Sequence, residues 1–316
     1  MDTRVNCARA AVQRGFELRV WASRRLHDVE SALEGWVTAD APAGLDHGAP
    51  AELVQAMRYA VLDGGKRLRP LLVLAACEAV QGNIHAAMRA ACAAELIHAY
   101  SLVHDDMPCM DNDVLRRGKP TVHVQFGEAT ALLAGDALQA LAFELLTPED
   151  ALVPVAMQAA WCRLLARAAG SAGMAGGQAI DLASVGCELS EKQLRDMHQL
   201  KTGALLQGSV MMGAACGDPS EKQTAALMQF GAAIGLAFQV VDDILDVTAD
   251  SATLGKTAGK DAVDRKPTYV SVLGLERSRG YAEELLDQAL AALDTSDLPH
   301  SQALRALAHM VIVRSS

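Results

Sequence analysis

Two aspartate clusters, each inside an apolar stretch, constrain the fold of this chain more than any other feature. Asp105 and Asp106 lie in His-Asp-Asp-Met-Pro-Cys-Met-Asp, and Asp242 and Asp243 lie in Gln-Val-Val-Asp-Asp-Ile-Leu-Asp. Apolar surroundings raise the energy of a bare carboxylate, so grouped carboxylates there need compensation. A hard divalent cation provides it, because Mg²⁺ typically takes one or two carboxylates together with substrate phosphate oxygens. The fold is therefore expected to aim both clusters at one cavity mouth.

Basic residues accompany the two acidic clusters along the chain. They are Lys66, Arg67, Arg69, Arg116, Arg117, Lys119, Lys201, Lys256, Lys260 and Lys266. Acidic clusters together with scattered bases indicate a site for a phosphorylated substrate bridged by metal. The alternative is that these are charges at helix ends and on solvated faces. That alternative would suffice for one cluster, but it is much weaker for two matched ones.

The composition favours helices. Hydrophobic residues make up 51% of the 316 and aromatic residues only 4%, while Ala is abundant, which suits close-packed helices better than a sheet. We find no convincing strand, repeat or long linker. The expected fold is all-α, a single large helical bundle around a central active-site cavity. Apolar periodicity and capping signals predict helices at 16–37, 51–62, 71–80, 86–104, 129–146, 151–169, 191–216 and 221–247, with the last within 270–313.

Charge and cysteine usage exclude some partners. The net charge of −10 argues against a nucleic-acid partner, although an anionic substrate follows local charge. Seven dispersed cysteines without a Cys-x-x-Cys pair indicate free thiols in a reducing cytosol, hence a cytoplasmic protein. Residues 1–15 are expected to be a basic N-terminal extension, ordinary or poorly ordered, with no signal peptide. The uncharged run 224–241 is expected to be a buried helix and not a membrane span.

Spacing places the first cluster on one helix face. His98, Ser101 and Asp105 are spaced i, i+3, i+7, and Pro108 should end the helix. The chain can then turn back so that the Asp111 carboxylate swings toward the same metals. In the second cluster Asp242 and Asp246 are spaced i, i+4, with Gln239 one turn earlier.

Four motifs carry a family resemblance. They are Gly-Gly-Lys-Arg-Leu-Arg-Pro at 64–70, the segment 105–117, Lys-Thr-Gly at 201–203 and Asp-Asp-Ile-Leu-Asp at 242–246. Together they resemble the trans-prenyltransferases, the short-chain isoprenyl diphosphate synthases, in order and rough spacing from about residue 51 to the C-terminus. The resemblance is strongest to bacterial farnesyl diphosphate synthases or their geranylgeranyl relatives. It implies one polyprenyl synthetase domain over residues 1–316.

The resemblance also implies roles for particular residues. Asp105 and Asp111 would hold two Mg²⁺ ions, with Asp106 in support, and Asp242 would hold a third, with Asp243 and Asp246 mostly in its water shell. Mn²⁺ would be able to substitute. The allylic diphosphate would be bound by Arg116, Lys201, Thr202, Gln239 and Lys256. Thr202, with Lys201 and Gln239, would also place dipoles near the transient cation. Isopentenyl diphosphate would be bound by Lys66, Arg69, His98 and Arg117. For His98 a satisfied core histidine is an equal alternative, and Lys260, Asp261 and Lys266 fit solvated loop charges equally well.

The implied reaction is ionisation of the allylic diphosphate, attack by isopentenyl diphosphate and loss of a proton. Tyr100 and Ser101 are expected to form the floor that limits chain length, with C15 favoured over C20 or C10. The resemblance also implies a homodimer. A terpene cyclase would usually lack the second set of bases, and a non-catalytic partner subunit would tend to lose an aspartate cluster.

Overall fold

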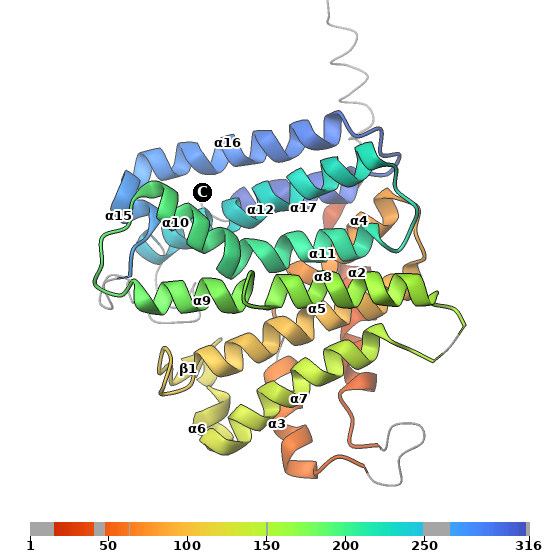
Figure 1. The fold of residues 1–316 in the computed structure, drawn as a ribbon, viewed down its shortest axis with the longest axis vertical. Helices are drawn as coiled ribbons and strands as arrows, with labels where there is room; N and C mark the ends of the chain where they lie inside the picture. The colour runs from red at the N-terminus through yellow and green to blue at the C-terminus, as the bar shows by residue number, and fades with distance from the viewer. Residues whose placement is uncertain (1–15, 41–47, 63, 150, 249–265, 314–316) are drawn as a thin grey trace, which may run out of the picture.

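The computed structural model describes residues 16–40, 48–62, 64–149, 151–248 and 266–313, and its architecture is a bundle of helices (Figure 1). The first half contains α2 (Leu18–Trp36), α3 (Ala51–Val61), α4 (Leu68–Ala79), α5 (Ile84–Asp105), α6 (Val122–Phe126), α7 (Glu128–Leu146) and α8 (Val155–Ala169). The second half contains α9 (Met174–Ala183), α10 (Glu191–His198), the π-helical turn η1 (Gln199–Gly203), α11 (Ala204–Ala214), α12 (Glu221–Thr248), α15 (Tyr269–Leu273), α16 (Leu275–Asp294) and α17 (Gln302–Val313). A two-stranded ribbon of β1 (Leu115–Arg116) and β2 (Lys119–Pro120) is the sheet of the described residues.

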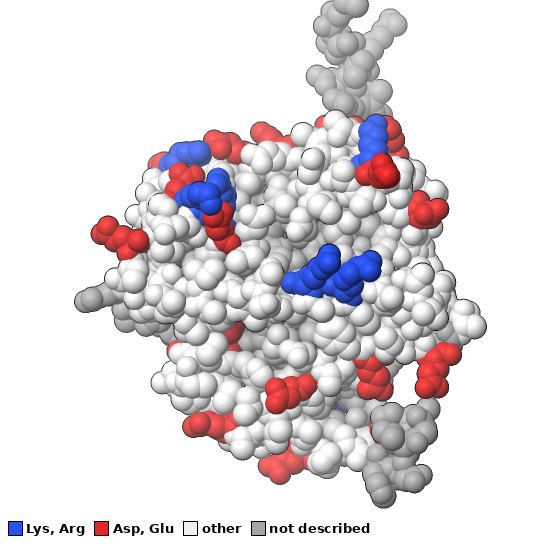
Figure 2. All heavy atoms as spheres, viewed as in Figure 1, with Lys and Arg blue, Asp and Glu red and all other residues white. Residues whose placement is uncertain are grey.

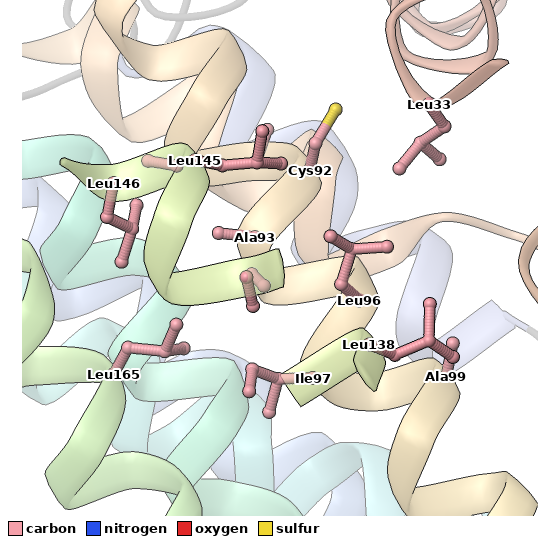
Figure 3. Packing of buried hydrophobic residues seen from close by; sticks show 14 of the residues in the cluster. Leu33, Cys92, Ala93, Leu96, Ile97, Ala99, Leu138, Leu145, Leu146 and Leu165 are labelled. Carbon is pink, nitrogen blue, oxygen red and sulfur yellow. The ribbon is translucent and has the colours of Figure 1, made fainter. Parts of the chain in front are cut away.

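Helix α5 is the central element. It packs against α4, α7 and α11, and also contacts α2, α3 and α8. Figure 3 shows its Cys92, Ala93, Leu96 and Ile97 interleaved with leucines of the surrounding helices. Small side chains along α5 let the neighbouring backbones approach closely, and the larger ones fill the space between them. Because α5 is fixed on so many sides, its C-terminal end at Asp105 is held rigidly.

The expected all-α class is confirmed, and most helix bounds agree with expectation to within a few residues. The capping box at Ser190 and Gln193 is present, with each partner bonding the other's backbone N–H. Three features were missed: the helix α9, the short helix α6 with its β-ribbon, and the interruption of the expected 191–216 helix by η1. The assignment of residues 1–316 to one domain stays a prediction, and the N-terminal extension 1–15 lies outside the described residues.

Two described helices are long and apolar enough to cross a membrane by length and composition alone, α7 and α12. Core helices of folded proteins pass the same test. In α12, 61% of the apolar window is buried inside the protein. It packs against α11, α16 and η1 and carries the second aspartate cluster, so its apolar length is used in the core, as expected for residues 224–241.

Candidate active site

The first aspartate cluster lies where α5 ends. The chain turns at Pro108, and the backbone N–H of Asp111 donates to the carbonyl of Asp105 at 2.9 Å, so the two aspartates are brought back together. Burial raises the pKa of Asp105 to about 6, with the Asp111 charge adding to the rise and Lys201 opposing it. The predicted return of Asp111 toward Asp105 is confirmed.

The Asp106 carboxylate lies in a different environment from that of Asp105. Its side chain is almost fully buried and accepts two hydrogen bonds from Arg116, at 2.7 Å from Nε and 2.5 Å from Nη2. A bidentate pair of this kind fixes the guanidinium plane. Asp106 therefore holds Arg116 at the cavity wall, while the supporting role expected for it in metal binding stays a prediction.

In the second aspartate cluster, too, one carboxylate lines a cavity and its neighbour does not. Asp242 lines a cavity, whereas Asp243 and Asp246 are buried and line neither of the two cavities described below. The Asp243 carboxylate accepts from Gln239 Nε2 at 2.8 Å and from the backbone N–H of Tyr269 at 2.7 Å. These inward contacts do not fit the water-shell position expected for Asp243. The i, i+1 spacing turns adjacent side chains of one helix by about 100°, so only one of the pair can face the cavity.

A cavity of about 510 Å³ collects most of the predicted phosphate-binding residues. Its wall includes Lys66, Arg69, His98, Arg116, Arg117, Thr202 and Asp242. Burial lowers the pKa of Arg69, with the Asp242 and Glu95 charges opposing the shift. Burial and the neighbouring arginines lower the pKa of His98 well below its ordinary value, so this ring is neutral near pH 7. A neutral imidazole among fixed cations can donate one hydrogen bond to an anion without adding a charge.

A second cavity, of about 350 Å³, lies beside the first. Tyr100 and Ser101 line it from α5, and α9 forms the facing wall with Met174, Gln178 and Leu182. Both cavities are lined by Arg69, His98, Leu102 and Thr202, so they meet there. The structure thus places a charged chamber next to a mainly apolar one, with Thr202 at their junction. Tyr100 and Ser101 thus line this cavity, while their role as its floor and their effect on chain length stay predictions.

Lys201 sits in a network that the sequence did not indicate. Its Nζ donates to Asp181 on α9 at 2.5 Å, and Lys266 reaches Asp111 at 2.9 Å and Asp181 at 3.8 Å. Lys266, left open between a site and a loop charge, is therefore in contact with the first cluster. Asp181 was missed because the glycines around it obscured α9. Met174, Gln178 and Asp181 are spaced i, i+4, i+7 and all buried, which was the available signal.

Two glycines fix the position of the turn that carries Lys201 and Thr202. A Cβ on Gly177 of α9 would lie 2.1 Å from the Lys201 nitrogen, and one on Gly235 of α12 would lie 2.7 Å from Gly203 Cα. The wide turn η1 therefore fits between α9 and α12 only because both glycines lack side chains. Single π-turns are frequent at functional sites, where they redirect side chains.

Gln239 and Lys256 are the remaining residues expected to bind the allylic diphosphate. Gln239 lines neither cavity; it lies behind Thr202, whose hydroxyl donates to Gln239 Oε1 at 2.8 Å. The substrate contact expected for Gln239 stays a prediction. Lys256, like Lys260 and Asp261, lies outside the described residues.

The carboxylates suit Mg²⁺ bound together with a substrate. Among the described residues no three His, Cys, Asp or Glu side chains are grouped closely enough to hold a metal on their own. Mg²⁺ usually takes only one or two carboxylates and completes its shell with water and phosphate oxygens. Asp105 and Asp111, brought together by the turn at Pro108, would supply such a pair.

Comparison with known proteins gives a consistent result. The polyprenyl synthetase family model matches residues 50–307. The chain is 49% identical over 273 residues to the heterodimeric geranylgeranyl pyrophosphate synthase large subunit 1 of Arabidopsis thaliana, covering 84% of this chain and 73% of that protein. It is 49% identical over 278 residues to a probable farnesyl diphosphate synthase of Sinorhizobium fredii, covering 87% and 81%. A crystal structure of the Helicobacter pylori geranyltransferase complexed with magnesium and isoprenyl diphosphate aligns with a TM-score of 0.80 at 35% identity, covering 95% of this chain and 97% of that one.

Proposed function

The chain belongs to the polyprenyl synthetase family and is a prenyltransferase, and from this premise we propose that it is a Mg²⁺-dependent farnesyl diphosphate synthase. It would condense isopentenyl diphosphate head-to-tail with dimethylallyl and then geranyl diphosphate. The observation that carries the proposal is the junction of the two chambers. One is lined by cations that suit diphosphates, and the other by side chains that suit a hydrocarbon tail.

The residues of the charged chamber would bind isopentenyl diphosphate. Lys66, Arg69 and Arg117 provide the positive charge, and neutral His98 provides a hydrogen bond. Arg117 also donates to the Gly64 carbonyl, which ties its guanidinium to the loop of Lys66. An arginine grips phosphate oxygens bidentately, whereas a lysine acts as a point charge, so together they would orient the diphosphate.

The allylic substrate would lie with its diphosphate near Asp105 and Asp111 and its tail in the second chamber. Lys201 and Arg116 would contact the diphosphate, and Thr202 would lie next to the carbon that ionises. When bound, Mg²⁺ would neutralise charge on the leaving diphosphate. We propose three ions, held by Asp105, Asp111 and Asp242, with Mn²⁺ able to replace Mg²⁺. The apolar wall would exclude water from the carbocation. The double bond of isopentenyl diphosphate would attack it, and the released diphosphate would take the proton.

The C15 product follows from the floor of the second chamber. The Tyr100 ring is nearly buried and stacks edge-on against His104 at 5.7 Å between ring centroids. A packed ring of this kind would stop a growing chain at C15. A C20 product is the second candidate, because a relative of 49% identity is named a geranylgeranyl synthase subunit. The double set of cations disfavours a terpene cyclase, which binds a single diphosphate, and both intact aspartate clusters disfavour a non-catalytic subunit.

A direct assay tests the proposal. The purified protein is incubated with isopentenyl and dimethylallyl diphosphates and Mg²⁺, and the products are sized. We expect mainly C15, and no product in excess EDTA. Asp105→Ala and Asp242→Ala should each lower kcat by several orders of magnitude while leaving the helical circular dichroism unchanged. Full turnover in EDTA would refute the metal dependence, and mainly C20 product would favour the second candidate.

We also propose that the protein is a cytoplasmic homodimer. Leu132 and Leu133 on α7 and Val124 on α6 are each about half exposed or more, which leaves an apolar surface on adjacent elements. On the face shown in Figure 2, uncharged side chains cover most of the surface and charges are sparse. Closed pairing of two copies is the commonest way to cover such a surface. The described cysteines are all free thiols, which suits a reducing compartment.

A further inference from the structure

A chain of hydrogen bonds runs from α15 to the junction of the two chambers. The backbone N–H of Tyr269 donates to Asp243 Oδ2 at 2.7 Å, and Gln239 Nε2 donates to Asp243 Oδ1 at 2.8 Å. The Thr202 hydroxyl then donates to Gln239 Oε1 at 2.8 Å. The chain thus links three elements, α15, α12 and η1.

The direction of the bonds in this chain follows from an ionised carboxylate at Asp243. A backbone N–H can only donate, and an ionised carboxylate can only accept. Asp243 therefore requires the NH₂ end of Gln239 to face it, which turns the Gln239 carbonyl oxygen toward Thr202. That oxygen can only accept, so it takes the single hydrogen of the Thr202 hydroxyl. The lone pairs of Thr202 Oγ1 are left for the cavity side.

Thr202 lies where this direction matters. It lines both chambers, beside Arg69, His98 and Leu102. A hydroxyl that presents its lone pairs to the junction stabilises positive charge there, whereas a hydroxyl that presents its hydrogen destabilises that charge. A dipole that is already oriented costs no reorganisation during the reaction.

We propose that Asp243 is a positioning residue that fixes the direction of the Thr202 hydroxyl, so that its oxygen lone pairs face the allylic cation. This inference rests on the proposed function and deepens it. It assigns the two adjacent aspartates different tasks, since Asp242 faces the chamber and Asp243 is 2% exposed and turned into the protein.

Asp243→Asn is the first test, because it preserves shape while it removes the negative charge and replaces one acceptor by a donor. The oxygen of the introduced amide has to accept from the Tyr269 N–H, so its NH₂ group faces Gln239. The Gln239 amide then flips, its NH₂ end donates to Thr202 Oγ1, and the Thr202 hydrogen is released toward the cavity. We expect kcat to fall at least tenfold, with KM for both substrates and the Mg²⁺ concentration for half-maximal rate changed less than threefold.

A compensating substitution makes the test specific. In Asp243→Asn/Gln239→Glu, the new carboxylate accepts from the introduced amide at position 243 and from Thr202, so the hydroxyl direction is restored and the negative charge is kept. The single variant Gln239→Glu places two carboxylates against each other and should also be impaired. We therefore expect the double variant to be at least fivefold faster than either single variant, a coupling that loss of structure alone does not produce.

Control measurements distinguish loss of folding from loss of the hydroxyl orientation. Melting temperature and circular dichroism are recorded for each variant, and Gln239→Met, which leaves Thr202 without its fixed acceptor, serves as a second probe if Asp243→Asn does not fold. It should lower kcat at unchanged KM. An unchanged kcat in Asp243→Asn or in Gln239→Met would overturn the inference. So would a raised Mg²⁺ requirement without rescue by Gln239→Glu, because Asp243 would then act on metal. An inactive wild-type protein would instead refute the proposed function.

Discussion

Neighbouring residues of the same type have different tasks in this site. Arg67 and Arg69 lie two positions apart and both line the charged chamber, yet Arg67 is bound by Glu30, Glu95 and the Val61 carbonyl, whereas Arg69 also lines the second chamber. Asp105 and Asp106 differ in the same way, as do Asp242 and Asp243. In the two aspartate pairs one side chain lines a chamber and the other holds the structure that supports it.

Tyr100→Ala should lengthen the product. Removing the ring opens space at the floor of the second chamber, so further additions of isopentenyl diphosphate can follow C15. Truncating a buried aromatic side chain costs about 3–5 kcal/mol, so the melting temperature is measured in parallel. Tyr100→Phe is the matched control, because it keeps the ring and should keep C15. An unchanged product distribution from folded, active Tyr100→Ala would show that another residue sets the length.

His198 should make the free protein less stable in acid. Burial lowers its pKa to about 4, against an ordinary value of 6.5. The unfolded chain therefore binds a proton that the folded one excludes, and stability is lost as the pH falls below 6.5, by about 1 kcal/mol at pH 5.5. His198→Phe keeps an aromatic ring next to Tyr269 and should flatten this part of the profile. Chemical denaturation at pH 7.5 and 5.5 measures both proteins, and an equal pH dependence would contradict the assignment.

At the scale of elements, the site depends on how closely the three helical segments α9, η1 and α12 approach one another. The turn η1 is packed between α9 and α12, and α9 also provides one wall of the second chamber and the carboxylate that binds Lys201. A small displacement of any of these elements would move Thr202 relative to the junction of the two chambers.

Gly177→Ala should therefore damage both packing and activity. Its Cβ would lie 2.1 Å from the Lys201 nitrogen, which is backbone and cannot swing aside, so α9 and η1 must separate. We expect a destabilisation of roughly 1–3 kcal/mol, as for overpacking, and a lower kcat. Gly280→Ala on α16 is the control, because the nearest atom is a flexible arginine nitrogen at 3.9 Å. It should stabilise by up to about 1 kcal/mol without affecting turnover. Equal effects of the two variants would refute the packing argument.

At the scale of the molecule, α5 and α12 extend from separate core regions and end at a common pair of chambers. The helices around α5 form one hydrophobic cluster and those around the start of α12 form another. Part of the exposed apolar surface of the described residues is on α6 and α7, which also pack against the outer side of the first core.

Leu133→Glu should weaken the proposed dimer. Leu133 is 56% exposed, so the substitution leaves the monomer core intact but places a charge on the apolar surface. Multi-angle light scattering at micromolar concentration should give a dimer for the wild type and a shift toward monomer for the variant. Val20→Glu, on the exposed side of α2, serves as the control. A monomeric wild type would refute the homodimer, and an unaffected variant would place the interface elsewhere.

The sequence by itself determined the fold class, the positions of most helices, the two aspartate clusters and the set of bases. These follow from local rules: helical periodicity, capping, and the need of buried carboxylates for cations. It did not determine α9, because glycine lowers helix propensity, and here the glycines are required by close contacts that exist only after folding. Nor did these local rules turn Asp243 into the protein or place Gln239 behind Thr202, because which side chain faces the cavity depends on helix rotation. Helix rotation is set by the packing of α12 against η1, α11 and α16, contacts between segments distant in sequence, and only the tertiary structure decided it.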